Sequence, residues 1–380
     1  MPKENPLLLF YRENNISPVH QDIENLRIHL KRREKLYIKL GIPPLVFSNR
    51  TILEIGPGGG HNALAFFSWG AKVDFVEPNP KAQEEISLLM NKYGVEKSRW
   101  HLFPGKVEDY PLATKYDVVI AEGIIPGIYN QEEILGKIAE LINPGGMVVV
   151  TCVDEISLFF EVLKRLIAFR LSADLENLTD KVKILSQAFA SHLQKLQYAS
   201  RPVQDWVTDQ FLNPALHADL FSIDDCVREF GEQFELLGSS PSLFTDLSWY
   251  KDTDFDFSNS LLEQLNRKRH ILLLWNMEES ERNTELNDRL FQSCSVIRKL
   301  EGEFEIYRSP DIIEAIIEHL HEIIALTNGL DSRIAAAINE VITLLKDDNL
   351  DAVKVAHAAN FAAAFGRGQQ YVSMVRKFTT

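Results

Sequence analysis

The sequence predicts an α/β fold whose sheet is mostly parallel, with a helical insertion and a helical C-terminal extension. Three observations predict it. Short apolar runs alternate with helical segments over residues 49–155, as in sheets covered by helices on both faces. The first run, residues 51–55, leads directly into a glycine-rich bend at 56–60. Residues 156–224 and 285–380 instead carry apolar side chains at helical spacing.

Composition indicates a globular protein and argues against several classes. Of 380 residues, 45% are hydrophobic and 25% are charged, which are ordinary values. No apolar run approaches the ~20 residues of a membrane span, and residues 1–5 do not begin a signal peptide. The net charge of −14 argues against a nucleic-acid surface, because phosphate contacts need concentrated Lys and Arg.

The three cysteines, Cys152, Cys226 and Cys294, are widely spaced and form no Cys-x-x-Cys pair. This spacing predicts reduced thiols and a cytoplasmic location rather than a zinc site. The sequence therefore predicts no bound metal.

Two nucleotide-cofactor patterns compete for the bend at 56–60. The dinucleotide fingerprint Gly-x-Gly-x-x-Gly fails, because its third glycine would fall at His61 or Ala63. The pattern Glu-x-Gly-x-Gly-x-Gly fits, at Glu54, Gly56, Gly58 and Gly60. A bend of this kind between a strand and a helix lets backbone N–H groups approach a ligand closely.

Four later segments follow in the order expected of successive strands and their loops. Residues 73–77 form an apolar run that ends in Glu77, 21 residues after Gly56, where a carboxylate can accept hydrogen bonds from ribose hydroxyls. Residues 105–109 follow a third run, 116–123 predict a fourth strand with its loop, and 141–150 contain a Pro-Gly-Gly turn into a fifth. In a parallel sheet these loops share one edge.

These five elements resemble class I S-adenosylmethionine-dependent methyltransferases over about residues 49–155, with weaker similarity to about residue 280. The resemblance implies a Rossmann-like sheet of seven strands, and an enzyme that uses S-adenosyl-L-methionine and releases S-adenosyl-L-homocysteine. It implies that an acidic residue at 105–109 meets the adenine amino group. It assigns cofactor binding to Glu54, Gly56, Gly58, Gly60, Glu77, Pro78, Val107, Glu108, Glu122 and Gly123. It places Glu54 near the cofactor's ammonium, the alternative being a strand-end carboxylate that caps local N–H groups.

The remaining segments are divided by their patterns. Residues 1–48 are predicted to be helical, and the charged stretch at 31–35 is either a solvated face or part of a helix across the cofactor site. In the second case Arg33 or Tyr37 would touch the methionine end or an anionic substrate. Residues 49–155 and 225–280 are predicted to form the cofactor-binding core, with the last two strands at 233–238 and 270–275. Residues 156–224 would form a lid and 285–380 a helical extension.

Acceptor-binding residues are expected in the lid and after the sixth strand. Arg201, Asp205 and Trp206 offer a fork of donors, a carboxylate and a stacking face, which suits a polar ring such as a sugar. The alternative is an internal Arg201–Asp205 pair with Trp206 as packing. Trp249 and Tyr250 could face the acceptor or lie in a surface loop.

A general base is needed only if the acceptor atom holds a proton at neutral pH. The candidates are His61, Asp154, Asp205 and His217. His61 is preferred, because it follows the glycine bend and an imidazole titrates near pH ~6.5. Its alternative role is a backbone contact at a helix N-terminus. Asp205 is the second choice.

The favoured function is methyl transfer to an oxygen or nitrogen of a small molecule, with a sugar or amino-sugar precursor of surface glycan as the expected acceptor. The N-terminal helix, residues 201–206 and residues 366–371 resemble a bacterial subfamily with such acceptors. The alternatives are a protein or RNA methyltransferase and a non-catalytic cofactor-binding protein. Residues 366–371 could also meet a partner subunit, which leaves a homodimer open.

Overall fold

The computed structural model describes residues 6–16, 23, 25–197, 199, 201–214, 219–252 and 257–378. The chain divides into two compact units, and each is described by itself. The first consists of residues 1–153, 214–262 and 369–380, and the second of residues 154–213 and 263–368. Two separate stretches of the sequence therefore build the second unit.

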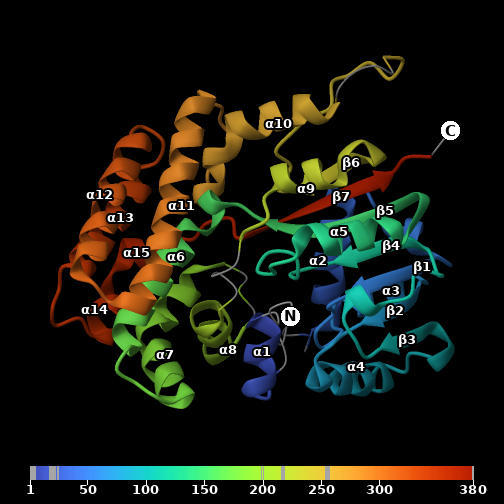
Figure 1. Cartoon of the computed structure of the whole chain (residues 1–380), viewed down its shortest axis with the longest axis horizontal. Coiled ribbons are helices and arrows are strands. Elements are labelled where there is room, and N and C mark those ends of the chain that lie inside the picture. Colours follow the sequence, from blue (N-terminus) through green and yellow to red (C-terminus); the bar gives the residue numbers. More distant parts are fainter. Residues whose placement is uncertain are drawn as a thin grey trace. The chain divides into compact units, whose positions relative to one another are not determined.

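The first unit contains a seven-stranded sheet, as the resemblance implies. Its strands are β1 (Thr51–Ile55), β2 (Lys72–Val76), β3 (Trp100–Phe103), β4 (Tyr116–Ala121), β5 (Ile142–Val153), β6 (Phe234–Ser240) and β7 (Gln369–Arg376). Their order across the sheet is β3-β2-β1-β4-β5-β7-β6 (Figure 1). The strands β1 to β5 pair in parallel, while β7 runs antiparallel to both β5 and β6. The loops after β1, β2, β3 and β4 consequently share one edge.

The predicted strand at residues 270–275 is wrong. Arg269–Leu273 form a 3₁₀ segment in the second unit, and all five of its side chains are buried. A short apolar run fits a buried helical turn as well as a buried strand. The last strand is instead β7, so residues 366–371 lead into the sheet rather than forming only a turn. The part of 225–280 that belongs to the first unit ends at residue 262.

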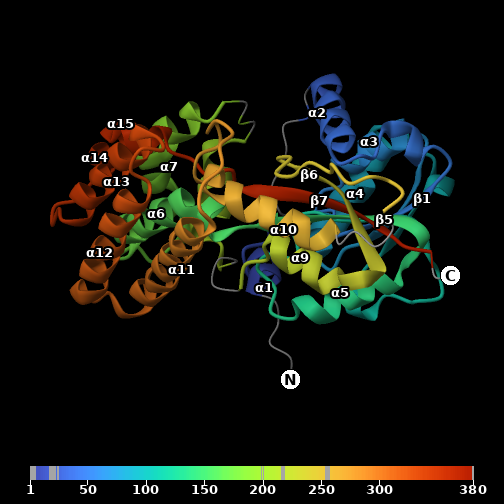
Figure 2. The ribbon, with the colours of Figure 1, turned by 90° about the horizontal axis from the view of Figure 1, so that it is seen from above.

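Helices cover both faces of the sheet. They include α2 (Leu26–Lys39), α3 (Ala63–Ser68), α4 (Pro80–Lys92), α5 (Gln131–Glu140) and α9 (Ile223–Phe230), while α1 (Pro6–Glu13) precedes them in the chain. Figure 2 shows α2, α3 and α4 over one face and α5 and α9 over the other. The Asn79 side chain caps α4 by accepting a hydrogen bond from Lys81 N at 3.0 Å, and Pro80 holds the first helical position. As a result, α4 begins close to the carboxyl end of β2.

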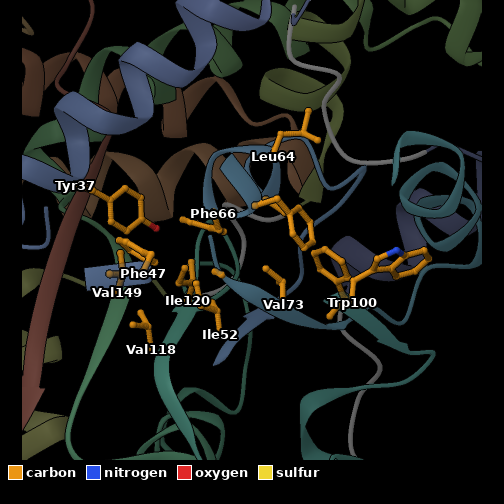
Figure 3. Packing of buried hydrophobic residues seen from close by; sticks show 14 of the residues in the cluster. Tyr37, Phe47, Ile52, Leu64, Phe66, Val73, Trp100, Val118, Ile120 and Val149 are labelled. Carbon is orange, nitrogen blue, oxygen red and sulfur yellow. The ribbon is translucent and has the colours of Figure 1, made fainter. Parts of the chain in front are cut away.

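The core of the first unit lies between the sheet and the helices α2 and α3. Tyr37 of α2 packs edge-on against Phe47 and Phe66, with ring centroids 5.2 and 5.5 Å apart. Figure 3 shows these rings beside Ile52 and Ile120 of the central strands. Burying a large apolar side chain contributes roughly 1.5–3 kcal/mol, and Tyr37 is fully buried. Packing thus anchors α2 to the sheet and limits where its polar side chains can lie.

The second unit is helical in its described residues. Its helices are α6 (Glu155–Ser172), α7 (Leu178–Lys195), α8 (Val203–Val207), α11 (Thr284–Tyr307), α12 (Pro310–Leu326), α13 (Ser332–Leu345), α14 (Ala352–His357) and α15 (Ala359–Ala363), and α10 (Phe257–Lys268) continues into it from the first unit. Most of α6 is buried, and Glu155 at its start pairs with Arg298 of α11 at 2.9 Å. A buried ion pair contributes little net stability, so we interpret this one as selecting α11 as the neighbour of α6. Within the described ranges, no helix is long and apolar enough to cross a membrane.

Candidate cofactor site

The glycine bend has a backbone that other residues rarely adopt. Gly56, Gly58 and Gly60 have φ angles of +63°, +55° and +78°, in the left-handed region that favours glycine. A Cβ atom at Gly56 would collide with the side chain of Ile124. The bend therefore follows β1 in a tight path that leaves its backbone amides close to the carboxyl edge of the sheet.

Glu77, directly after β2, holds the bend from the side. Its Oε2 accepts a hydrogen bond from Gly58 N at 3.1 Å, and its Oε1 accepts one from Asn79 N at 2.8 Å. Burial raises the pKa of Glu77 to about 7, although both hydrogen bonds oppose the shift. Each carboxylate oxygen keeps a second lone pair, which suits the ribose contact implied for it. The neighbouring Pro78 is half-buried.

Glu54, the fourth residue of β1, is a buried carboxyl with an unsatisfied oxygen. It is 2% exposed, and its Oε2 has no hydrogen-bond partner among the described residues. Burial, followed by the charge of Glu122, raises its pKa to about 8, while Arg33 acts in the opposite direction. A buried acceptor without a partner is uncommon in folded proteins. A cationic group bound nearby would both stabilise the ionised form and satisfy this oxygen.

The loops after β3 and β4 contribute the other residues assigned to the cofactor. Val107 is buried in a 3₁₀ turn, and the half-buried Glu108 accepts a hydrogen bond at Oε1 from Asn130 Nδ2 at 3.2 Å. Gly123 has a φ of +75°, and its N–H donates to Thr151 Oγ1 at 2.7 Å. These residues follow parallel strands, so they lie at the same edge as the glycine bend and Glu77.

Glu122 is bound to the N-terminal helix rather than open to a ligand. Arg33 of α2 donates to both of its oxygens, at 2.5 and 2.9 Å. Tyr37 OH donates to Oε1 at 3.0 Å, and Asn62 Nδ2 donates to Oε2 at 3.2 Å. In the charged stretch 31–35, Arg33 alone is buried while the other four residues are exposed. One side of this stretch is thus solvated and the other packs at the sheet edge, and a contact of Arg33 or Tyr37 with the cofactor or an anionic substrate stays a prediction.

His61 follows the bend directly and is half-buried. Its carbonyl oxygen lies 3.1 Å from Nε2 of the buried His29 on α2. Burial, and next the charge of Arg33, lowers the pKa of His29, which favours its neutral form, and the carbonyl oxygen of His61 can accept a hydrogen bond from the Nε2–H tautomer. This contact uses only the backbone of His61 and leaves its assignment as a base a prediction.

The expected Arg201–Asp205 pair is replaced by another. Arg201 Nη1 binds Asp209 Oδ2 at 2.9 Å, and Asp209 lies in a π-helical turn at residues 208–212, directly after α8. Asp205 is half-buried on α8, in the second unit. Trp206 is 6% exposed and lies 4.9 Å from the ring of Phe211, so it packs in the interior of that unit.

The other acceptor and base candidates have different surroundings. Trp249 and Tyr250 are 65% and 83% exposed in the loop after β6. Asp154 caps the N-terminus of α6 and binds Arg269 Nε at 2.7 Å, so it has a structural role. His217 lies outside the described residues. In the part of the chain that the structure describes, no group of His, Cys, Asp and Glu could hold a metal ion.

Sequence reasoning missed two polar residues at the sheet edge. Asn62 was read only as part of the helix after the bend, yet it donates to Glu122. Thr151 is fully buried in β5. The only sequence signal for it is that it is a polar residue in an apolar strand. Both hold backbone or side chains at the edge where the cofactor is expected.

A family model described as a methyltransferase domain matches residues 29–220, just over half of the chain. The chain belongs to the class I S-adenosylmethionine-dependent methyltransferase family. The methyltransferases of this family use S-adenosylmethionine as their cofactor. The structure fits this cofactor, because the glycine bend, Glu77 and the unsatisfied Glu54 oxygen gather at one edge of the sheet.

The methyltransferase has curated relatives that match only part of it. It is 29% identical over 108 residues to the mitochondrial ubiquinone biosynthesis O-methyltransferase of Schizosaccharomyces pombe, covering 28% of this chain. It is 28% identical over 98 residues to a thiol S-methyltransferase of Homo sapiens, covering 25% of this chain. In both comparisons the match spans 39% of the relative's own length.

Solved structures with this methyltransferase fold are distant. The N-methyltransferase NodS of Bradyrhizobium japonicum, in complex with S-adenosyl-L-homocysteine, has a TM-score of 0.31 and 13% identity, covering 40% of this chain and 75% of NodS. PKMT2 of Rickettsia typhi has a TM-score of 0.41 and 15% identity, covering 62% of this chain and 49% of PKMT2.

Proposed function

We propose that this methyltransferase moves the methyl group of S-adenosylmethionine to an oxygen or nitrogen atom of a small molecule, with a sugar or amino-sugar precursor of surface glycan as the favoured acceptor. The observation that carries the cofactor half of the proposal is the bend at Gly58, whose amide is bound by Glu77. A small-molecule acceptor agrees with the relatives, one named for O-methylation in ubiquinone biosynthesis and the other for S-methylation of a thiol, and the second makes sulfur the alternative acceptor atom. The sugar acceptor rests on the sequence resemblance and on the Arg201, Asp205 and Trp206 segment.

Each residue at the edge has a simple task in this proposal. Glu77 binds the ribose hydroxyls, and Glu54 in its ionised form faces the ammonium group. The bound cofactor supplies an electrophilic methyl group on a sulfonium, so the protein mainly provides proximity, alignment and exclusion of water. His61, beside the bend, takes the proton from an acceptor hydroxyl or ammonium.

The proposal is tested by methyl transfer from labelled cofactor to three sets of acceptors: nucleotide sugars with free sugars, small thiols, and a protein and RNA extract. Label in a sugar or amino sugar supports the proposal. Label in a thiol changes the acceptor atom, and label in protein or RNA changes the acceptor class. Cofactor binding without transfer to any set would favour a non-catalytic protein.

Replacing His61 by Gln tests the base. Because the amide cannot take a proton, kcat should fall by about a hundredfold near neutral pH, within the usual range for loss of a general base. The rise of the wild-type rate with pH that deprotonation of the base produces should also disappear from the pH profile. An unchanged profile with unchanged kcat would remove His61 from the reaction.

Asp205→Asn tests the second candidate. We expect cofactor affinity to stay the same and kcat to fall by about tenfold or more, since the carboxylate can act on an acceptor proton and the amide cannot. The matched control is Asp209→Asn, which weakens the pair with Arg201 and retains Asp205. If both variants turn over at the wild-type rate, the segment 201–209 does not serve the reaction.

A further inference from the structure

Glu122 has no acceptor capacity left for a cofactor. A carboxylate offers about four lone-pair sites. Arg33 Nη2 and Tyr37 OH occupy Oε1, and Arg33 Nη1 and Asn62 Nδ2 occupy Oε2. The role that the resemblance implies for Glu122 is therefore open to a different interpretation, in which its partners are protein groups.

Arg33 is fixed by more than this one carboxylate. Its side chain is 7% exposed and that of Glu122 is 9% exposed, so the bidentate pair is shielded from water. The guanidinium carbon also lies 5.2 Å from the ring centre of Tyr37, itself in the core. One turn earlier on α2, His29 contacts the carbonyl oxygen of His61. Two successive turns of α2 thus hold the loops after β1 and β4.

We propose that Arg33 is a positioning residue which, through Glu122, fastens α2 to the loops after β1 and β4 and so sets the affinity for cofactor without touching it. The inference rests on the proposed function of this edge. It assigns the two neighbouring acids different tasks: Glu122 is bound to α2, and Glu54, with its unsatisfied oxygen, faces the ligand. A direct contact of Arg33 with the cofactor's carboxylate is the competing explanation.

The first experiment uses two ligands that differ only in that carboxylate: S-adenosylmethionine and its decarboxylated form. Arg33→Met should weaken both by the same factor, about tenfold, because the loosened helix affects either ligand. If Arg33 binds the carboxylate, the variant would lose affinity only for the intact cofactor, which would overturn the inference. Arg32→Met is the matched control, since Arg32 is an exposed residue of the same helix with the same charge.

A double-mutant cycle adds a second criterion. Glu122→Gln should weaken cofactor binding as much as Arg33→Met does, and the double variant should be no weaker than either. Independent, additive losses would show that Arg33 acts on the cofactor without Glu122. A fall in melting temperature with unchanged affinity would make Arg33 merely structural and would also overturn the inference. If Arg33→Met does not fold, Tyr37→Phe removes one bond to Glu122 and keeps the ring, with an expected loss of about threefold.

Hydrogen exchange in the ligand-free protein separates this inference from the proposed function. Arg33→Met should accelerate exchange of the amides of α2 by about tenfold or more relative to those of α4, which is the internal reference. If the wild type binds no S-adenosylmethionine, the proposed function fails. This measurement still shows whether the Arg33–Glu122 pair fastens α2. Equal exchange in α2 of the wild type and the variant would overturn it.

Discussion

Gly58→Val should raise the dissociation constant for S-adenosylmethionine by about a hundredfold or more, equivalent to about 2.7 kcal/mol. At a φ of +55°, the backbone of an L-residue is strained by roughly 1–2 kcal/mol, and that of a β-branched residue is strained by more. Relief of that strain would move the Gly58 amide away from the buried Glu77, which would lose a hydrogen bond. A valine side chain would also occupy the space beside the bend. Titration calorimetry measures the loss directly.

The control for this variant is Gly94→Val. Gly94 has a similar φ of +62°, and a Cβ atom there would meet nothing within 4 Å. It lies after α4 on the surface, so it shares the backbone strain and not the location. We expect Gly94→Val to lower stability and keep wild-type affinity. Cofactor binding by Gly58→Val at wild-type strength would refute the proposed site.

Affinity for S-adenosylmethionine should rise with pH between about 6 and 8, by up to tenfold per unit. In the ligand-free protein the pKa of Glu54 is raised to about 8, first by burial and second by Glu122, against the opposing charge of Arg33. A bound ammonium favours the ionised carboxylate, so binding below pH 8 must release a proton from Glu54. Glu54→Gln should remove most of this pH dependence and weaken binding above pH 8. An equally steep profile in the variant would place the linkage elsewhere, with Glu77 the next acid to test.

The raised pKa of Glu54 also predicts that the free energy of unfolding falls as pH rises. The pKa of Glu54 is higher in the folded chain, about 8, than its ordinary value of 4.5. Its contribution is therefore complete below pH 4.5 and is lost as pH rises through 8, at about 1.4 kcal/mol per unit for one proton. Urea unfolding should show that the wild type loses more stability than Glu54→Gln between pH 5.5 and pH 8. Parallel curves would mean that Glu54 ionises in the folded protein as it does in the unfolded one.

Local patterns predicted the parallel half of the fold well. The strands β1 to β5 follow one another with short connections, and each is an apolar run bounded by a loop, so their signals lie close together in the sequence. The strand β7 could not be found this way, because it pairs with a strand that is distant in the sequence. For example, Val375 of β7 pairs with Met147 of β5. The run at 270–275 was mistaken for it because burial on every side hides the difference between a strand and a helical turn.

The site shows the same division between local and long-range information. The spacing of Glu54, the three glycines of the bend and Glu77 predicted that they lie at one edge of the sheet, where the structure has them, and their contacts with the cofactor stay predictions. The Arg33–Glu122 pair joins residues 89 positions apart, and no periodicity records such a contact. An internal Arg201–Asp205 pair was one of two alternatives for that segment, and the structure instead pairs Arg201 with Asp209, eight positions along the chain.

The position of β7 between β5 and β6 has a consequence for biosynthesis. As the chain leaves the ribosome, the parallel strands can pair in turn, and β5 then presents an open edge with unmade backbone bonds. β6 emerges later, yet it has no neighbour to join until translation has passed residue 376, and residues 263–368 of the second unit are made between β6 and β7. The nascent protein therefore carries two strands, β5 and β6, that each lack a neighbour. Both gain it when β7 is made.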